Sequence, residues 1–147
     1  MNHNLKTSDH SDLNFYYQQI DYIEKNKQEL VLQWQDHSLP QAKLDRFFDL
    51  YLLHLNEYVT SCLNQEVPKM DKVFIGSSIS VKYLDDDEEE HYTICFPEEI
   101  DPDYGKISIF SPIGRQLLLK NLDEEISLEI PTGTLRIKIV DIKHFPQ

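Results

Sequence analysis

The stretch ISIFSPIGRQLLLK, residues 107–120, runs from a β-like alternation into a helix and decides how the second half of the chain is built. Ser111 is a good N-cap, because its hydroxyl can accept a hydrogen bond from an amide of the first helical turn. Pro112 suits the first helical position, where its fixed φ is helical and its missing N–H costs nothing. Gly114 lowers helix propensity, which indicates close approach by another backbone or surface. The segment therefore predicts a strand, a sharp corner and a helix from Pro112 to about Lys120.

This corner has two interpretations. In the first, it is a capped helix that packs Ile113, Leu117 and Leu118 on a sheet. In the second, it is a binding corner, with Arg115 pointing outward one turn from the tip of the helix. The local sequence is compatible with both, and the rest of the chain decides between them.

Residues 73–147 contain five runs that are rich in β-branched and aromatic residues, several of them alternating with a period of two. The clearest turn signal is Thr132-Gly133, directly after Pro131. The acidic run DDDEEE, residues 85–90, is expected to be a solvated hairpin tip, because contiguous carboxylates on a turn do not converge as metal ligands must. We predict a five-stranded, largely antiparallel sheet with one helix before the fourth strand. The runs are VFIGSSISVKYL, HYTICF, KISIF, EISLEI and TLRIKIVDI.

The first half of the chain carries apolar residues at alternating spacings of three and four, which is typical of helices with one apolar face. Two such rows, joined by a short turn with Pro40, predict an antiparallel helical hairpin (a coiled coil) over residues 12–64. Residues 1–11 lack periodicity and are expected to be a disordered lead-in, and 65–72 a polar linker. The rows are Leu13, Tyr16, Ile20, Ile23, Lys27, Leu30 and Trp34, then Leu44, Phe48, Tyr51, Leu55, Tyr58 and Cys62.

Four further apolar residues of the second helix, Phe47, Leu50, Leu53 and Val59, lie off this predicted seam. An isolated two-helix rod would leave them in water, so something is expected to cover them. The candidates are the other half of the chain, a second copy or a partner protein. The predicted class is thus α+β: a helical hairpin followed by a sheet domain at residues 73–147.

The composition excludes several classes of function. A net charge of −12 argues against non-specific nucleic-acid binding, which needs clustered Lys and Arg. The chain has no apolar run near the ~20 residues that a membrane span needs, and no apolar signal segment at its start. Cys62 and Cys95 have no metal-binding spacing and are expected to be buried thiols in a reducing cytoplasm.

No catalytic constellation is visible in the sequence. The six histidines are scattered, none forms an HExxH motif or a metal spacing with cysteine, and there is no GxSxG motif or phosphate-binding glycine loop. We therefore expect no catalytic residue, no metal site and no cofactor, and the chain is not expected to be an enzyme.

Residues 73 to about 143 resemble the C-terminal domain of the Gre (GreA/GreB) family of bacterial transcription elongation factors. VFIGSSISVKYLDDDEEEHYTI resembles the family's entry strand, acidic hairpin and Tyr-containing strand. ISIFSPIGRQLLLK resembles its Ser-Pro-(Ile/Leu)-Gly-(Arg/Lys) segment, and IPTGTLRIKIVDI its Pro-x-Gly hairpin and final strand. The resemblance implies an FKBP-like domain without proline isomerase activity that docks on RNA polymerase beside the secondary channel, while the coiled-coil hairpin projects into that channel. The implied polymerase-binding residues are Phe110, Ser111, Pro112, Ile113, Gly114 and Arg115.

The hairpin tip departs from the family. Cleavage-stimulating Gre factors carry an Asp and a Glu three residues apart, which help to hold a catalytic magnesium ion in the polymerase; Mg²⁺ prefers such hard oxygen ligands. Here the expected tip has Asp36 and His37, but Leu39 stands three residues after Asp36, and the next acid is Asp45. The pair is missing, as in Rnk-type Gre homologues, although this hairpin is longer than theirs.

Two further departures follow the predicted helix. The family usually has Gly where this chain has Leu119, and Gly-Asp where it has Asp123-Glu124. These changes are expected to alter the end of the helix without destroying the fold.

Three functions remain open at this point. The leading hypothesis is a regulator that binds RNA polymerase at the secondary channel without stimulating transcript cleavage. The second is a protein-interaction adaptor that binds another partner through the extra apolar stripe of the second helix. The third is a true transcript-cleavage factor that uses Asp36 with a displaced acid. The expected partner is RNA polymerase, with no sequence-specific nucleic acid and no membrane, and the protein is expected to be cytoplasmic and a monomer or weak dimer.

Overall fold

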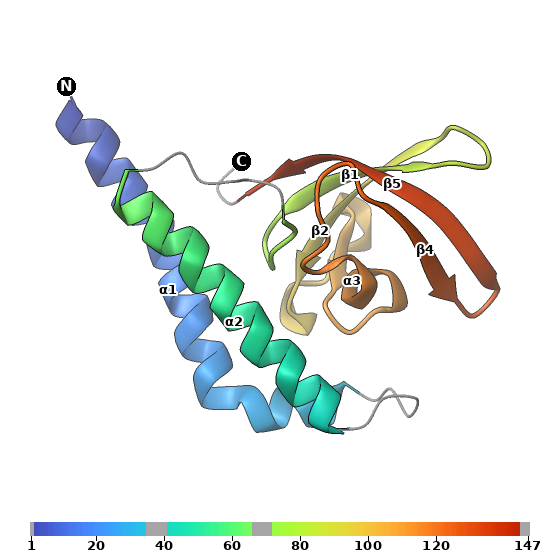
Figure 1. Cartoon of the computed structure of the whole chain (residues 1–147), viewed down its shortest axis with the longest axis horizontal. Coiled ribbons are helices and arrows are strands. Elements are labelled where there is room, and N and C mark those ends of the chain that lie inside the picture. Colours follow the sequence, from blue (N-terminus) through green and yellow to red (C-terminus); the bar gives the residue numbers. More distant parts are fainter. Residues whose placement is uncertain (1, 35–40, 66–71, 145–147) are drawn as a thin grey trace. The chain divides into compact units, whose positions relative to one another are not determined.

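A computed structural model of the chain describes residues 2–34, 41–65 and 72–144 (Figure 1). The chain forms two compact units, Met1–Lys69 and Met70–Gln147. The first contains the helices α1 (Asn2–Gln33) and α2 (Gln41–Leu63). Among the described residues, no helix is both long and apolar enough to cross a membrane.

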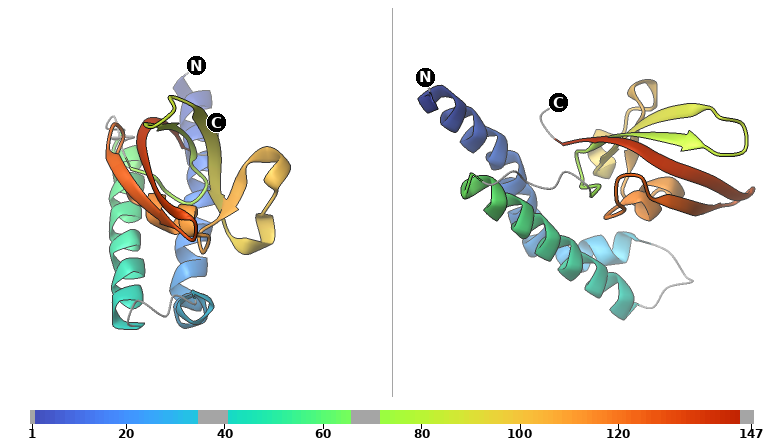
Figure 2. Two further views of the ribbon diagram at one scale, coloured as in Figure 1. Left: turned by 90° about the vertical axis from the view of Figure 1, so that its right-hand side faces the viewer. Right: turned by 45° about the horizontal axis from the view of Figure 1, so that its top comes forward.

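The helices α1 and α2 lie side by side in both views of Figure 2 and form the expected hairpin. Their antiparallel pairing follows from two aromatic contacts. Tyr16, near the middle of α1, meets Tyr58, late in α2, with ring centroids 5.4 Å apart. Trp34, just after α1, meets Phe48, early in α2, at 5.7 Å. Because α1 begins at Asn2, the helix extends through residues that the sequence assigned to a disordered lead-in.

The buried face of the hairpin differs in part from the predicted seam. Val59, predicted to lie off the seam, is buried, whereas Tyr58 and Cys62 are only half-buried. The reason is helical geometry: a straight helix with 3.6 residues per turn drifts away from a strict seven-residue repeat. The buried set is Leu13, Tyr16, Gln19, Ile23, Leu30, Val31 and Trp34, with Leu44, Phe48, Tyr51, Leu55 and Val59.

A polar pair lies inside this seam. The Tyr51 hydroxyl donates a hydrogen bond to Oε1 of Gln19, and both residues are buried. A buried polar pair in an otherwise apolar helix interface favours the one register in which both partners meet. Gln19 was absent from the predicted row, where the neighbouring Ile20 stands instead; Ile20 is only half-buried.

α1 is kinked at Asn26, whose backbone is non-helical at φ −118° and ψ 15°. The Asn26 side chain donates to the carbonyl of Tyr22 at 2.8 Å. The next residue, Lys27, interrupts the apolar row and reaches across to Asp49 of α2, with Nζ 2.6 Å from Oδ1. A local bond such as that from Asn26 to the Tyr22 carbonyl competes with the backbone hydrogen bonds of the helix and can bend it.

The second unit is a strongly curled five-stranded sheet with α3 (Pro112–Leu117) on its concave side (Figure 1). The strands are β1 (Ser78–Tyr83), β2 (Glu89–Cys95), β3 (Lys106–Ser108), β4 (Glu125–Ile130) and β5 (Gly133–Lys143). Their order is β3-β2-β1-β5-β4, and only the pair β2–β3 is parallel. The predicted α+β class and largely antiparallel sheet are confirmed. α3 ends earlier than expected.

The apolar core of this unit is formed by residues of the strands and the connecting segments, with Leu117 from α3. The acidic run is exposed at the β1–β2 turn, where Lys82 Nζ lies 3.3 Å from Asp87 Oδ1. The core residues are Val73, Phe74, Ile75, Ile79, Val81, Ile94, Cys95, Ile109, Leu117, Leu118, Leu128, Ile137, Ile139 and Ile142.

Candidate docking corner between β3 and α3

The corner that joins β3 to α3 is held by a dense set of hydrogen bonds around Ser111. The Ser111 hydroxyl accepts from the amide of Gly114 at 3.0 Å and donates to the carbonyl of Ser108 at 2.8 Å. Pro112 occupies the first turn of α3, and Ser111 is its N-cap. The amide of Phe110 donates to the Ser108 hydroxyl at 3.0 Å. The predicted cap and the predicted role of Pro112 are both present.

Gly114 is buried because the backbone of Ser108 passes directly beside it. A Cβ built on Gly114 would lie 2.1 Å from the Ser108 carbonyl oxygen and 2.8 Å from Ser111 Oγ. The close approach that the sequence indicated is therefore made by the strand residue just before the corner. Gly114 shapes the corner from inside and offers no side chain to a partner.

The other five candidate residues line the surface of the corner. Pro112 is exposed, and Phe110, Ser111, Ile113 and Arg115 are partly exposed. Of the three residues expected to pack on the sheet, Leu117 and Leu118 are buried, whereas Ile113 keeps part of its surface. The corner thus combines a rigid backbone with an apolar surface that carries one cation, Arg115.

Gln116 was missed by sequence reasoning. Its carboxamide Nε2 donates to the carbonyl of Pro112 and to that of Glu129, both at 2.6 Å, and its Oε1 accepts from the amide of Glu129 at 2.8 Å. The side chain therefore pairs with β4 as a neighbouring strand would, and ties α3 to the edge of the sheet. The local sequence gives no indication of the contact between Gln116 and Glu129, which are 13 residues apart in the chain.

The chain leaves α3 through two residues with left-handed backbone. Leu119 and Asp123 both have φ of 67°. These are the positions where the Gre family usually has glycine. The amide of Leu119 donates to Val73 at 2.8 Å and that of Asp123 to Ile139 at 2.7 Å, so the turn geometry is kept without glycine. α3 itself ends at Leu117, two residues before Leu119.

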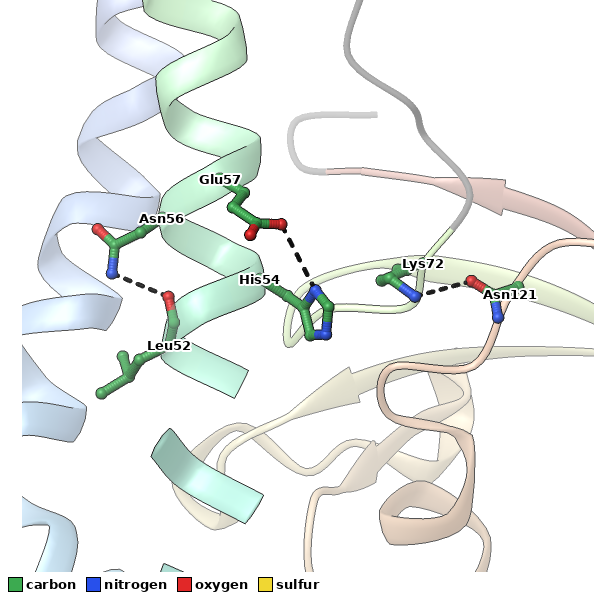
Figure 3. A network of polar contacts seen from close by, with 6 residues as sticks. All are labelled: Leu52, His54, Asn56, Glu57, Lys72 and Asn121. Atoms are coloured by element: carbon green, nitrogen blue, oxygen red, sulfur yellow. Dashed lines mark hydrogen bonds and ion pairs between the residues drawn. The ribbon is translucent and has the colours of Figure 1, made fainter. Parts of the chain in front are cut away.

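Asn121 holds the segment around Lys72, which precedes β1, against this turn. Lys72 Nζ donates to Asn121 Oδ1 at 3.0 Å (Figure 3), and Glu124 Oε1 accepts from the Asn121 amide at 2.9 Å. Figure 3 also shows two contacts within α2: Asn56 donates to the carbonyl of Leu52 at 2.8 Å, and His54 Nδ1 lies 3.7 Å from Glu57 Oε2.

Other reactive groups of the second unit are enclosed by the fold. Ser77 Oγ lies 3.0 Å from His144 Nδ1, and it also accepts a hydrogen bond from the amide of Phe74. Because Ser77 is fully buried, the pair serves to join the start of β1 to the end of β5.

Desolvation by burial raises the pKa of the Cys95 thiol to about 11. Burial and the Tyr83 hydroxyl, 2.6 Å away, raise the pKa of Tyr92. Cys62 is half-buried, less than expected.

Two further expectations concern metal ligands and the hairpin tip. Across the side chains that the structure describes, residues 13–34, 42–65 and 72–144, no group of three or more His, Cys, Asp or Glu is arranged to hold a metal ion. Asp36 and His37, the predicted tip residues, lie outside the described residues, as does Leu39.

A hairpin followed by a curled mixed sheet, with a Ser-Pro-Ile-Gly-Arg corner in front of its helix, is the architecture of the Gre transcription factors. The sequence model of the family "Transcription elongation factor, GreA/GreB, C-term" matches residues 67–144, more than half of the chain. The chain belongs to the GreA/GreB family.

Sequence relatives agree with this assignment. The chain is 42% identical over 81 residues to transcription elongation factor GreA of Chloroherpeton thalassium, covering 55% of this chain and 51% of that protein. It is also 42% identical over 81 residues to GreA of Caldanaerobacter subterraneus, with 55% and 52% covered. The chain thus spans about half the length of the curated relatives it matches.

One solved structure supports the fold. The prokaryotic transcription elongation factor GreA/GreB from Nitrosomonas europaea superposes with a TM-score of 0.50 at 20% identity, covering 88% of this chain and 93% of that one. At this identity the likeness concerns the fold alone.

Proposed function

We propose that this protein binds RNA polymerase beside the secondary channel through the β3–α3 corner, and that its hairpin enters the channel without stimulating transcript cleavage. It is a regulator that acts on the polymerase and is not itself an enzyme. The observation that carries the proposal is the corner itself: the motif that the Gre family uses for docking lies on a rigid, partly exposed turn.

The geometry of the corner suits docking on a preformed surface. Ser111 and Gly114 fix the backbone, so little conformational entropy is lost when Phe110, Pro112 and Ile113 are covered. An apolar surface with an Arg at its margin is typical of protein interfaces, in which aromatic residues and Arg are enriched.

The absence of cleavage stimulation is proposed from the tip sequence. Helping to hold a catalytic Mg²⁺ requires convergent carboxylate oxygens. Asp36 has no acid three residues further on, because Leu39 stands there. A single carboxylate leaves the ion mostly hydrated and weakly held.

Two measurements test the proposal. The tagged full chain is incubated with purified core RNA polymerase, and binding is expected in the absence of DNA; no binding would contradict the proposed function. The chain is then added to a backtracked elongation complex, where transcript cleavage is expected to stay at the intrinsic rate. Stimulated cleavage would establish the third hypothesis, a true cleavage factor.

A gain-of-function variant sharpens the second measurement. Leu39→Glu places an acid three residues after Asp36 and restores the spacing of the family pair. If the missing carboxylate is the reason for inactivity, this variant gains cleavage stimulation, and Leu39→Gln, of similar size but without charge, does not. An inactive Leu39→Glu variant that still binds polymerase would show that the tip is unsuited for another reason.

The second candidate, a protein-interaction adaptor, is favoured by one observation. Leu50 and Leu53 of α2 are 48% and 54% exposed, as an adaptor with an unused apolar face requires. It is distinguished by the polymerase experiment, since an adaptor with another partner does not bind the core enzyme.

A further inference from the structure

α2 carries a second stripe on the side opposite to the hairpin seam. Arg46, Leu50, Leu53 and Glu57 follow one another at spacings of four, three and four, which places all of them on one face of the helix. All four are exposed. The seam residues Leu44, Phe48, Tyr51 and Leu55 lie on the opposite face and are buried.

The two leucines are the unusual members of this stripe. Singly exposed leucines are common on protein surfaces. Leu50 and Leu53 are neighbours in one stripe, 48% and 54% exposed, with a cation one turn before them and an anion one turn after them. Leu32 of α1 is more exposed, at 69%, and so provides a comparison for any test of the pair.

The order of these residues is complementary to itself. When two copies of α2 pack antiparallel about a two-fold axis midway between Leu50 and Leu53, each Leu50 meets Leu53 of the other copy. The same axis places each Arg46 opposite Glu57 of the other copy, because both pairs have the same midpoint in the sequence. It also places Asp49 opposite His54. A two-fold interface requires this kind of self-complementarity.

Neighbouring registers are less favourable. An axis at Leu53 would place Asp49 opposite Glu57, which are like charges. An axis at Leu50 would place Leu53 opposite Phe47 and separate Arg46 from Glu57. Charge pairing of this kind selects register and orientation between helices.

We propose that a second copy of this chain covers the stripe, forming an antiparallel α2–α2 dimer centred between Leu50 and Leu53 and closed at both ends by Arg46–Glu57 ion pairs. The dimer is weak and concentration-dependent. Four leucines bury far less than the ~800 Å² per partner of a standard stable interface, and exposed ion pairs contribute modestly.

The carboxylates that the dimer uses are accessible in the single chain. The Glu57 side chain is 66% exposed although it lies 3.7 Å from His54 of its own helix. The Asp49 side chain is 65% exposed although it binds Lys27 of α1. Each can therefore meet a polar side chain of a second copy without a rearrangement of the hairpin.

The first test measures the molar mass of the full chain by sedimentation velocity from micromolar to millimolar concentration. We expect the molar mass to rise from that of a monomer to that of a dimer. This rise is expected to be absent in Leu53→Lys and to be retained in the control Leu32→Lys. Lys at position 53 lies one turn from both Asp49 and Glu57, so the helix of the monomer is not expected to lose stability. A chain that stays monomeric at millimolar concentration overturns the proposal.

The second test uses charge reversal and fixes the register. Arg46→Glu and Glu57→Arg each place like charges together twice in the symmetric dimer, and each is expected to weaken association about fivefold. The double variant Arg46→Glu/Glu57→Arg restores both pairs and is expected to regain wild-type association at low salt. Failure of this rescue while both single variants weaken association overturns the proposed register.

Thermal unfolding distinguishes between two groups that could cover Leu50 and Leu53: a second copy of the chain and another segment of the same chain. If Leu53→Lys lowers the melting temperature of a protein that is monomeric in its wild-type form, another segment of the same chain covers the leucines and the proposal is wrong. If the wild type is a dimer, Leu53→Lys has a lower melting temperature than the wild type only at high protein concentration, where dimer formation stabilises the wild type.

Discussion

Gly114 is the residue at which the corner has least room. Its missing Cβ would lie 2.1 Å from the Ser108 carbonyl oxygen, so Gly114→Ala must displace either the end of β3 or the first turn of α3. We expect a loss of about 2–3 kcal/mol in the free energy of unfolding, measured with urea. Polymerase binding is expected to fall as well, because the corner changes shape.

Gly133 provides the control for this prediction. Its φ of 139° also disfavours other residues, but a Cβ there would meet nothing within 4 Å. Gly133→Ala is therefore expected to lose only about 1 kcal/mol through backbone strain, and to leave polymerase binding intact. If Gly114→Ala and Gly133→Ala lost equal amounts of unfolding free energy, the close contact between Gly114 and Ser108 would not contribute to the cost of the substitution.

Cys95 allows a prediction about pH. Burial raises the pKa of its thiol to about 11, so the reactive thiolate is scarce at neutral pH. With the native chain at pH 8, a thiol reagent is expected to modify half-buried Cys62 quickly and Cys95 slowly. The rate at Cys95 then rises as the pH approaches 11. Because the folded state retains the proton longer than the unfolded state, stability falls through this range. Rapid modification of both thiols at pH 8 would contradict the enclosure of Cys95.

At the scale of elements, Gln116 covers one position, Glu129, on the β4 edge of the sheet. In the β4–β5 hairpin Ile130 pairs with Gly133 across a two-residue turn, so the alternation of an antiparallel ladder points the amide of Glu129 away from β5. The Gln116 carboxamide takes the place of a further strand there, at 2.6 and 2.8 Å. Open edges favour association with other chains, and a covered edge avoids it.

Gln116→Ala is expected to remove the protection of a single amide more than that of its neighbours. Hydrogen exchange followed by NMR checks this: the Glu129 amide accelerates, while the amides of Leu128 and Ile130, which face β5, change little. The stability loss is about 1 kcal/mol, since water replaces the lost bonds at an exposed site. Unchanged exchange at Glu129 would show that Gln116 does not cover the edge.

Leu55 tests the hairpin seam. It is fully buried, and Leu55→Asp places an unpaired charge in an apolar interface, with a loss of more than about 3 kcal/mol expected. Far-UV circular dichroism should show a loss of helix. Leu53→Asp, two residues away on the exposed face, is the matched control. Its repulsion from Asp49 and Glu57, each one turn away, costs only about 0.2–0.5 kcal/mol per pair, so the helix content is expected to be kept. Helix lost in both variants would contradict the assignment of the two faces.

The accuracy of the sequence prediction differs between elements for physical reasons. The cap at Ser111, Pro112 and the crowding at Gly114 were predictable because they follow from local stereochemistry. Val59 was misassigned because the apolar row was extrapolated as a strict heptad, whereas the helix turns by 3.6 residues. The kink at Asn26 comes from a side-chain bond to Tyr22 that has no distinct sequence signal.

At the scale of the whole molecule, tertiary pairing limits what the sequence reveals about the site. The motif marks the corner, but the Gln116–Glu129 contact that fixes α3 depends on how β4 folds back. The parallel placement of β3 beside β2 likewise depends on a connection without a periodic pattern. The sequence therefore identifies the residues of the corner more readily than the groups that hold them in place.

The charge of the molecule leads to the last prediction. The chain carries a net charge of −12, so Arg115 is a cation at the corner of an acidic protein. If the corner were only a capped helix, Arg115→Glu would change stability by less than about 0.5 kcal/mol and affect nothing else. If it docks on polymerase, reversal of a charge at the margin of the interface slows association, and salt screens the effect. We expect Arg115→Glu to melt like the wild type and to bind core polymerase more weakly at low salt, with the difference shrinking as salt is raised. Pro112→Ala, which loosens the junction without adding repulsion, is expected to have a smaller effect without this salt dependence. Equal binding of Arg115→Glu and wild type at low salt would remove Arg115 from the interface and leave the corner with a purely structural role.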